Sequence, residues 1–183
     1  MFKSERLRFS DKNIQGNGVT FKDPFKQPIG IVSRWIEENG VVVFKHKECN
    51  TIVNLARGSM AAAISDTGAT GVVSHFKLGS GGHQLLPSED ILIPVPPEVT
   101  DVGLEVPVYS QAITLYEYSE TGDTTVTFQI TIEKADANDG AAFPYTEAGL
   151  FTSAGTVLFS RDTFPAMIKT PARKFYFEWA IVF

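Results

Sequence analysis

The last ten residues of the chain constrain its fold more than any other segment. In Lys174 to Phe183 the large apolar side chains take alternate positions, at Phe175, Phe177, Trp179, Ile181 and Phe183. A period of two residues is typical of a β-strand, whose successive side chains point to opposite faces of a sheet. The other face carries further apolar side chains, Tyr176, Ala180 and Val182, beside Lys174 and Glu178. We therefore expect a central, mostly buried strand.

The same period recurs upstream, between residues that favour turns. It predicts strands over 29–37, 41–47, 72–78, 105–118, 124–133, 147–151 and 156–160. Asn39-Gly40 can supply the positive φ angles of a tight hairpin turn between the first two. Strands separated by turns at intervals of roughly 8–15 residues are typical of an antiparallel β-sandwich. We expect such a sandwich, of jelly-roll or immunoglobulin type, over residues 29–183.

One helix and two irregular segments complete the expected organisation. Asn50 or Thr51 can cap a helix near 52–64, where apolar side chains recur at a spacing of three to four. Residues 1–28 indicate an extended arm, because Gly and Pro interrupt every period there. We expect this arm to pack on its own domain or on a neighbour. The segment Gly79 to Gly103 is long for a connection without structure of its own, which is typical of functional or interface-forming loops.

Composition and charge narrow the classes of protein. The 21 aromatic residues argue against a disordered chain, and the single Cys49 excludes an intramolecular disulfide framework and a multi-cysteine zinc site. The net charge of −5 divides into +4 over residues 1–58 and −9 over 59–183. The basic N-terminal part could contact an acidic partner, including the acidic part of another copy. The alternative is that the difference in sign has no role. We expect no nucleic-acid binding and no membrane insertion.

The residues that could carry chemistry form no recognisable site. His46, His75 and His83 lack the spacing of a metal pair, and Gly79 to Gly82 lacks the Lys-Ser/Thr of a phosphate-binding loop. Cys49 is expected to be a small buried thiol. Glu147 lies near a strand start, where backbone donors or Lys169 could satisfy its carboxylate. We therefore expect no enzyme and assign no catalytic, cofactor-binding or metal-binding residue.

Several segments form an ordered set, namely 50–58, 76–83, 145–151, 162–170 and 177–183. This set resembles small structural proteins of tailed bacteriophages, found among tail, baseplate and fibre-associated virion components. The resemblance covers about residues 50–183. It implies a non-enzymatic virion protein, assembled in the host cytoplasm, whose partners are other virion proteins and copies of itself.

The expected interface combines the arm and the long loop. Its residues are Phe2, Phe9, Phe21, Phe25, Gly81, Gly82 and His83. Two alternatives stay open at this point. One is a carbohydrate-binding, receptor-contacting module that binds a host glycan through Tyr116, Tyr118 or Tyr145. The other is a capsid decoration or neck protein.

Overall fold

The computed structural model describes residues 28–64, 71–86, 91–119, 124–138 and 142–183. The predicted anchors Phe2, Phe9, Phe21 and Phe25 lie outside these residues. The elements are β1 (Ile29–Glu38), β2 (Val41–Ile52), α1 (Asn54–Ile64), β3 (Val73–Gly79), β4 (His83–Leu86), β5 (Ile91–Pro94), β6 (Pro107–Ala112), β7 (Tyr116–Ser119), β8 (Thr125–Ile132), β9 (Phe143–Thr152), a 3₁₀ turn (Ser153–Gly155), β10 (Val157–Lys169) and β11 (Arg173–Val182).

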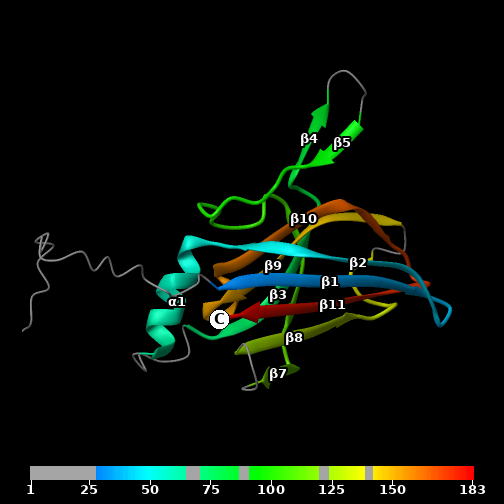
Figure 1. Cartoon of the computed structure of the whole chain (residues 1–183). Helices are drawn as coiled ribbons and strands as arrows, with labels where there is room; N and C mark the ends of the chain where they lie inside the picture. Colours follow the sequence, from blue (N-terminus) through cyan, green and yellow to red (C-terminus); the bar gives the residue numbers. More distant parts are fainter. Residues whose placement is uncertain (1–27, 65–70, 87–90, 120–123, 139–141) are drawn as a thin grey trace, which may run out of the picture.

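The fold is mainly β and antiparallel, with one helix among the described residues, as expected. Nine strands form one curled sheet in the order β6-β3-β9-β10-β2-β1-β11-β8-β7 (Figure 1). The remaining two strands, β4 and β5, pair only with each other and stand away from the sheet at the top of the figure. The helix α1 lies at the left end of the sheet, close to the C-terminus.

The expected division into two separate sheets is not clear in the structure, because β2 joins the two halves. This 12-residue strand pairs with β1 from Val41 to Asn50, whereas Thr51 and Ile52 pair with β10. The sheet is therefore continuous through β2 and curls into a half-barrel. Along Val41–Asn50 the outer edge of β2 has no partner strand among the described residues.

The core lies between the two halves of the curled sheet. Phe76 on β3 packs against Phe177 on β11, with ring centroids 4.8 Å apart, and meets the edge of Trp179 at 6.2 Å. Phe164 on β10 approaches Phe177 at 6.3 Å. All four side chains are buried. The C-terminal strand lies between β1 and β8, which confirms its predicted central position.

Several predictions were wrong, because the tertiary structure decides which strands pair and which faces are exposed. The single strand expected over 105–118 is broken, because β6 pairs with β3 and β7 pairs with β8, at opposite ends of the sheet. The long loop contains the β4–β5 hairpin, which breaks the expectation of a segment without structure of its own. Cys49 is exposed rather than buried, because it lies on the outward face of β2.

Other local predictions are confirmed. The helix ends at Ile64 as expected and begins two residues later than predicted, at Asn54. Asn39 and Gly40 have φ angles of 54° and 80°, as a tight hairpin turn requires. Phe128, Ile130 and Ile132 point into the core from β8.

Replacing Phe76 by Ala should lower the free energy of unfolding by about 3–5 kcal/mol, because it removes a fully buried ring from contact with both Phe177 and Trp179. Chemical denaturation measures the change. Val43→Ala on the exposed part of β2 is the control and should change stability by about 0.5 kcal/mol or less. A loss below about 1 kcal/mol for Phe76→Ala would contradict this account of the core.

Candidate functional site

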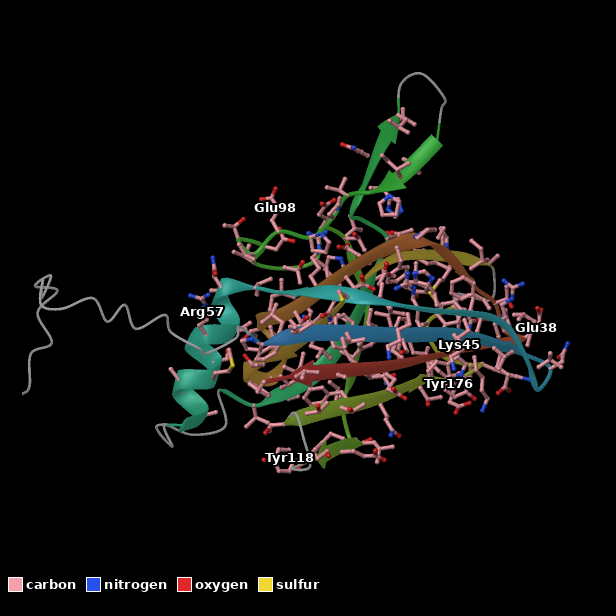
Figure 2. The ribbon with its side chains drawn as sticks, in the orientation of Figure 1. Glu38, Lys45, Arg57, Glu98, Tyr118 and Tyr176 are labelled. Carbon is pink, nitrogen blue, oxygen red and sulfur yellow. The ribbon has the colours of Figure 1, made fainter. Side chains whose placement is uncertain are left out.

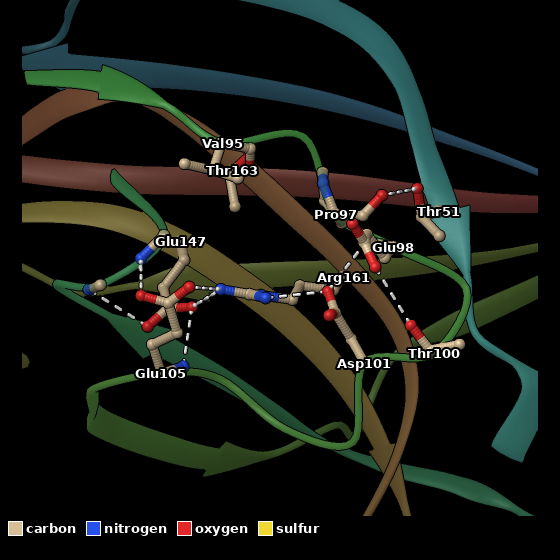
Figure 3. Close-up of polar contacts among 12 residues, drawn as sticks. Thr51, Val95, Pro97, Glu98, Thr100, Asp101, Glu105, Glu147, Arg161 and Thr163 are labelled. Carbon is tan, nitrogen blue, oxygen red and sulfur yellow. Dashed lines mark hydrogen bonds and ion pairs between the residues drawn. The ribbon is translucent and has the colours of Figure 1, made fainter. Parts of the chain in front are cut away.

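A partly buried polar cluster fixes the long loop onto the sheet. We call it the anchoring cluster, and it consists of Asp101, Glu105, Glu147 and Arg161 (Figure 3). Glu147 lies on β9 and Arg161 lies on the adjacent β10. Asp101 and Glu105 come from the loop between β5 and β6.

The carboxylate of Glu147 is the centre of this cluster and is fully buried. One of its oxygens accepts hydrogen bonds from the backbone N–H of Gly81 at 3.1 Å and of Val106 at 2.9 Å. The other accepts from the backbone N–H of Glu105 at 3.1 Å and from Arg161 Nη2 at 2.7 Å. Four donors match the roughly four acceptor sites of a carboxylate. Burial of this charge is therefore compensated by hydrogen bonds and by a cation.

Arg161 connects the three carboxylates. Its Nη1 donates to Asp101 Oδ2 at 2.8 Å, and its Nη2 lies 3.3 Å from Glu105 Oε1. Burial disfavours the charged guanidinium, but its hydrogen bonds to Asp101 and Glu147 raise the pKa of Arg161 above its ordinary value. A hydrogen bond from the backbone N–H of Gly82 lowers the pKa of Glu105, with Arg161 adding to the effect. Both shifts favour the charged forms of Arg161 and Glu105.

The loop glycines are needed because the backbone approaches the cluster closely. A Cβ atom at Gly81 would lie 2.6 Å from the Cβ of Glu105, and one at Gly82 would lie 2.7 Å from Cγ2 of Thr163. Gly82 also has a φ of 74°. The backbone N–H groups of both glycines thereby reach carboxylates. The structure places these two predicted interface residues, with His83, at the base of the hairpin; their role in an interface remains a prediction.

Threonine side chains hold the loop at further points. Thr163 on β10 donates to the carbonyl of Val95 at 2.7 Å, and Thr51 on β2 donates to that of Pro97 at 3.1 Å. Thr146 donates to the carbonyl of Gly81 at 2.8 Å. Both ends of the β4–β5 hairpin are therefore fixed to the sheet.

The sequence pointed to Glu147 but only partly to its partners. From the sequence we expected either backbone donors or Lys169 to satisfy this carboxylate, and backbone donors do so. The other expectation was wrong, because Lys169 donates to the carbonyls of Lys134 and Thr170 instead. Burial lowers the pKa of Lys169. Arg161 was missed, although an arginine between Ser160 and Asp162 in a strand rich in apolar residues was a usable signal.

A second buried polar group lies on the other side of β10. Arg34 on β1 is 1% exposed and donates to Asp162 Oδ2 at 2.8 Å. It also pairs with Glu48 of β2, and its guanidinium lies 4.6 Å from the centre of the Phe164 ring. Burial raises the pKa of the Asp162 carboxyl to about 7; the attraction of Arg34 offsets this only in part, and the negative Glu48 adds to it.

A groove opens beside this group, where β2 and β10 separate. We call it the seam groove, and its volume is about 430 Å³. Its walls are mostly apolar, with polar groups from β1, β2 and β11. The residues that line it are Arg34, Ile36, Phe44, His46, Glu48, Pro165, Ala166, Met167, Ile168 and Arg173.

Replacing Glu147 by Gln should lower the free energy of unfolding by about 3 kcal/mol, because Arg161 loses a buried anionic partner and an amide nitrogen faces backbone donors. Chemical denaturation gives the change, and hydrogen exchange should become faster at the amides of Gly81, Glu105 and Val106. Glu117→Gln, exposed on β7, serves as the matched control. An unchanged exchange rate at those three amides would show that Glu147 does not hold the loop.

Asp162 should make the protein less stable as the pH rises from about 4 to 7. Its carboxyl has a pKa of about 7 in the folded state and about 3.9 in the unfolded state, so the folded state binds more protons in this range. Between pH 5.5 and pH 8 this amounts to a loss of roughly 2 kcal/mol. Asp162→Asn should remove this part of the pH dependence in denaturation measured across that range. Asp136→Asn is the control, and equal slopes for wild type and Asp162→Asn would refute the prediction.

Comparisons of the chain with known proteins found no relative. No protein-family model, curated protein or solved structure matches the chain. Within the described residues, no group of three or more His, Cys, Asp or Glu side chains is arranged to hold a metal ion. No helix in the described part of the chain is long and apolar enough to cross a membrane. The functional argument therefore rests on the anchored loop and on the surfaces that it presents.

Proposed function

We propose that the chain is a non-enzymatic structural protein of a tailed-phage virion. It docks into a symmetric tail, baseplate or fibre-attachment assembly through the arm of residues 1–28 and the long loop of residues 79–103. Other virion proteins and copies of the chain are its partners. The ordered motifs of residues 50–183 support the class of protein, and the anchored loop supports the mode of docking.

The observation that carries the proposal is the β4–β5 hairpin. It stands away from the sheet (Figure 1), and its cross-strand pair Leu85 and Leu92 is 52% and 65% exposed. A two-stranded hairpin without further packing is marginally stable in water. Such a hairpin, fixed at its base by a partly buried ionic cluster, is suited to pack against another molecule. Because the hairpin is already held in place before it binds, binding loses less conformational entropy.

The sandwich of jelly-roll or immunoglobulin type remains part of this proposal. The packing of Phe76 on β3 against Phe177 on β11, across the core, supports it. In this description the half-barrel is a sandwich whose two halves are joined through β2 and open along the seam groove.

A carbohydrate-binding role is the second candidate, favoured by two exposed tyrosines. Tyr116 and Tyr118 on the edge strand β7 are 66% and 58% exposed, and Figure 2 shows Tyr118 at the margin of the sheet. Exposed aromatic rings on one edge could stack on sugars. Tyr145 cannot contribute, because it is buried and its hydroxyl donates to the carbonyl of Ala137.

The double replacement Leu85→Ser and Leu92→Ser should leave the domain folded but lower its copy number in purified particles by roughly tenfold or more, because the apolar contact of the hairpin is lost. Quantitative mass spectrometry of particles from a genome that encodes the variant measures this. Tyr116→Ser with Tyr118→Ser is the control, since it also removes two exposed apolar groups.

Normal incorporation of the Leu85/Leu92 variant would refute docking through the hairpin. If the tyrosine variant enters particles normally but those particles no longer adsorb to cells, the carbohydrate-binding candidate is favoured instead.

A further inference from the structure

The hairpin and the seam groove have complementary properties, although they lie on different parts of the molecule. The hairpin offers an exposed pair of leucines and two strand edges that pair with no third strand in the described part of the chain. The groove offers apolar walls and lies beside the free edge of β2. We propose that the hairpin of one copy docks in the seam groove of a second copy of the chain. This inference rests on the proposed function and names its partner.

The free edge of β2 is the first argument. From Val41 to Asn50 this edge has no partner among the described strands, and Val41, Val42 and Val43 are each more than half exposed. Exposed strand edges with apolar side chains, as at Val41 to Phe44, pair with other chains unless they are covered. A strand of the hairpin can add to such an edge through backbone hydrogen bonds. Side chains on one face of the added strand would then enter the groove.

The character of the groove is the second argument. Phe44 is 39% exposed at its margin, and Pro165 and Ala166 are exposed on the β10 side. At about 430 Å³ the groove has room for the paired side chains of Leu85 and Leu92. The pairing of β10 with β9 shifts its register between Thr163 and Met167, and this part of β10 supplies one wall of the groove.

Charge is the third argument, and it selects this groove over the other apolar recess. The segment 78–133, which contains the hairpin, carries nine Asp and Glu and no Lys or Arg. His46 and Arg173 line the seam groove, and Arg173 also pairs with Glu38. Its acidic residue Glu48 is already paired with Arg34. Among the described residues, no charged residue lines the recess of about 260 Å³ between α1 and the end of β11, so these residues offer an acidic segment no such attraction.

The proposed contact joins two different surfaces and is therefore heterologous. Each copy would offer one hairpin and accept one hairpin. A heterologous contact generates a closed ring or an open filament, according to the rotation between neighbours. Either arrangement would suit the symmetric assembly of the proposed function.

A mixing experiment on the full chain tests this contact. Leu85→Ser with Leu92→Ser removes the docking side chains, and Ala166→Glu places a negative charge in the groove. Val99→Ser with Val102→Ser, two exposed loop valines outside both surfaces, is the matched control. Sedimentation velocity over about 1–500 µM measures assembly, and thermal melts verify that each variant is folded.

We expect wild type and the control to form species larger than a dimer. Each variant alone should assemble with an affinity roughly tenfold or more below that of wild type. An equimolar mixture of the two variants should give one dimer and nothing larger, because only one intact hairpin and one intact groove remain to combine. This pattern also shows that each variant keeps its other surface intact.

Three results would overturn the inference: assembly of either variant as strong as wild type, a mixture that stays monomeric while wild type assembles, or a monomeric wild type throughout the range. In the last case the proposed function would stand if the Leu85/Leu92 variant is still excluded from particles, because the hairpin would then bind another virion protein. The proposed function itself fails if that variant enters particles normally.

Discussion

The carboxylate of Glu147 accepts hydrogen bonds from segments that are far apart in the chain, and the position of the long loop depends on it. Gly81 and Val106 stand at the two ends of this loop, while Arg161 belongs to the adjacent strand β10. A buried carboxylate is costly unless every acceptor site is used and a cation lies nearby. The geometry that satisfies it therefore permits one arrangement of the loop ends. Because the loop ends are fixed, the direction of the β4–β5 hairpin is fixed as well.

The second constraint is the length of β2, which makes one sheet from two halves. Its last two residues pair with β10, and its first ten pair with β1. Because β10 turns away after this contact, the sheet stays continuous at one end and opens at the other. The open end exposes apolar side chains of β2 and brings the buried Arg34 to the floor of a groove. Continuity of the sheet and an uncovered strand edge are thus consequences of the same pairing.

These two features are the basis on which we propose a role in assembly. The ionic groups of the anchoring cluster bind one another, and their hydrogen bonds are directed at the backbone of the loop rather than at a cavity. The larger apolar exposures lie on a hairpin, a strand edge and a loop, where another chain can add to them. In the proposed assembly, the hairpin of one copy and the groove of the next join copies in sequence.

The sequence alone determined the local structure. Alternation in β8 and β11 assigned their inward faces, Asn39-Gly40 assigned a hairpin turn, and the apolar spacing of 52–64 assigned the helix to within two residues, because these signals depend on neighbouring residues. Tertiary structure decided how β6 and β7 separate to opposite ends of the sheet, which cation meets Glu147, and that β2 connects the two halves. Such contacts join residues many positions apart, and Arg161 and Lys169 are equally good partners for a carboxylate until the fold places one of them beside it. The sequence pattern of each segment specifies which secondary structure and which side-chain contacts it can form. The packing of distant segments then selects which of these contacts are made.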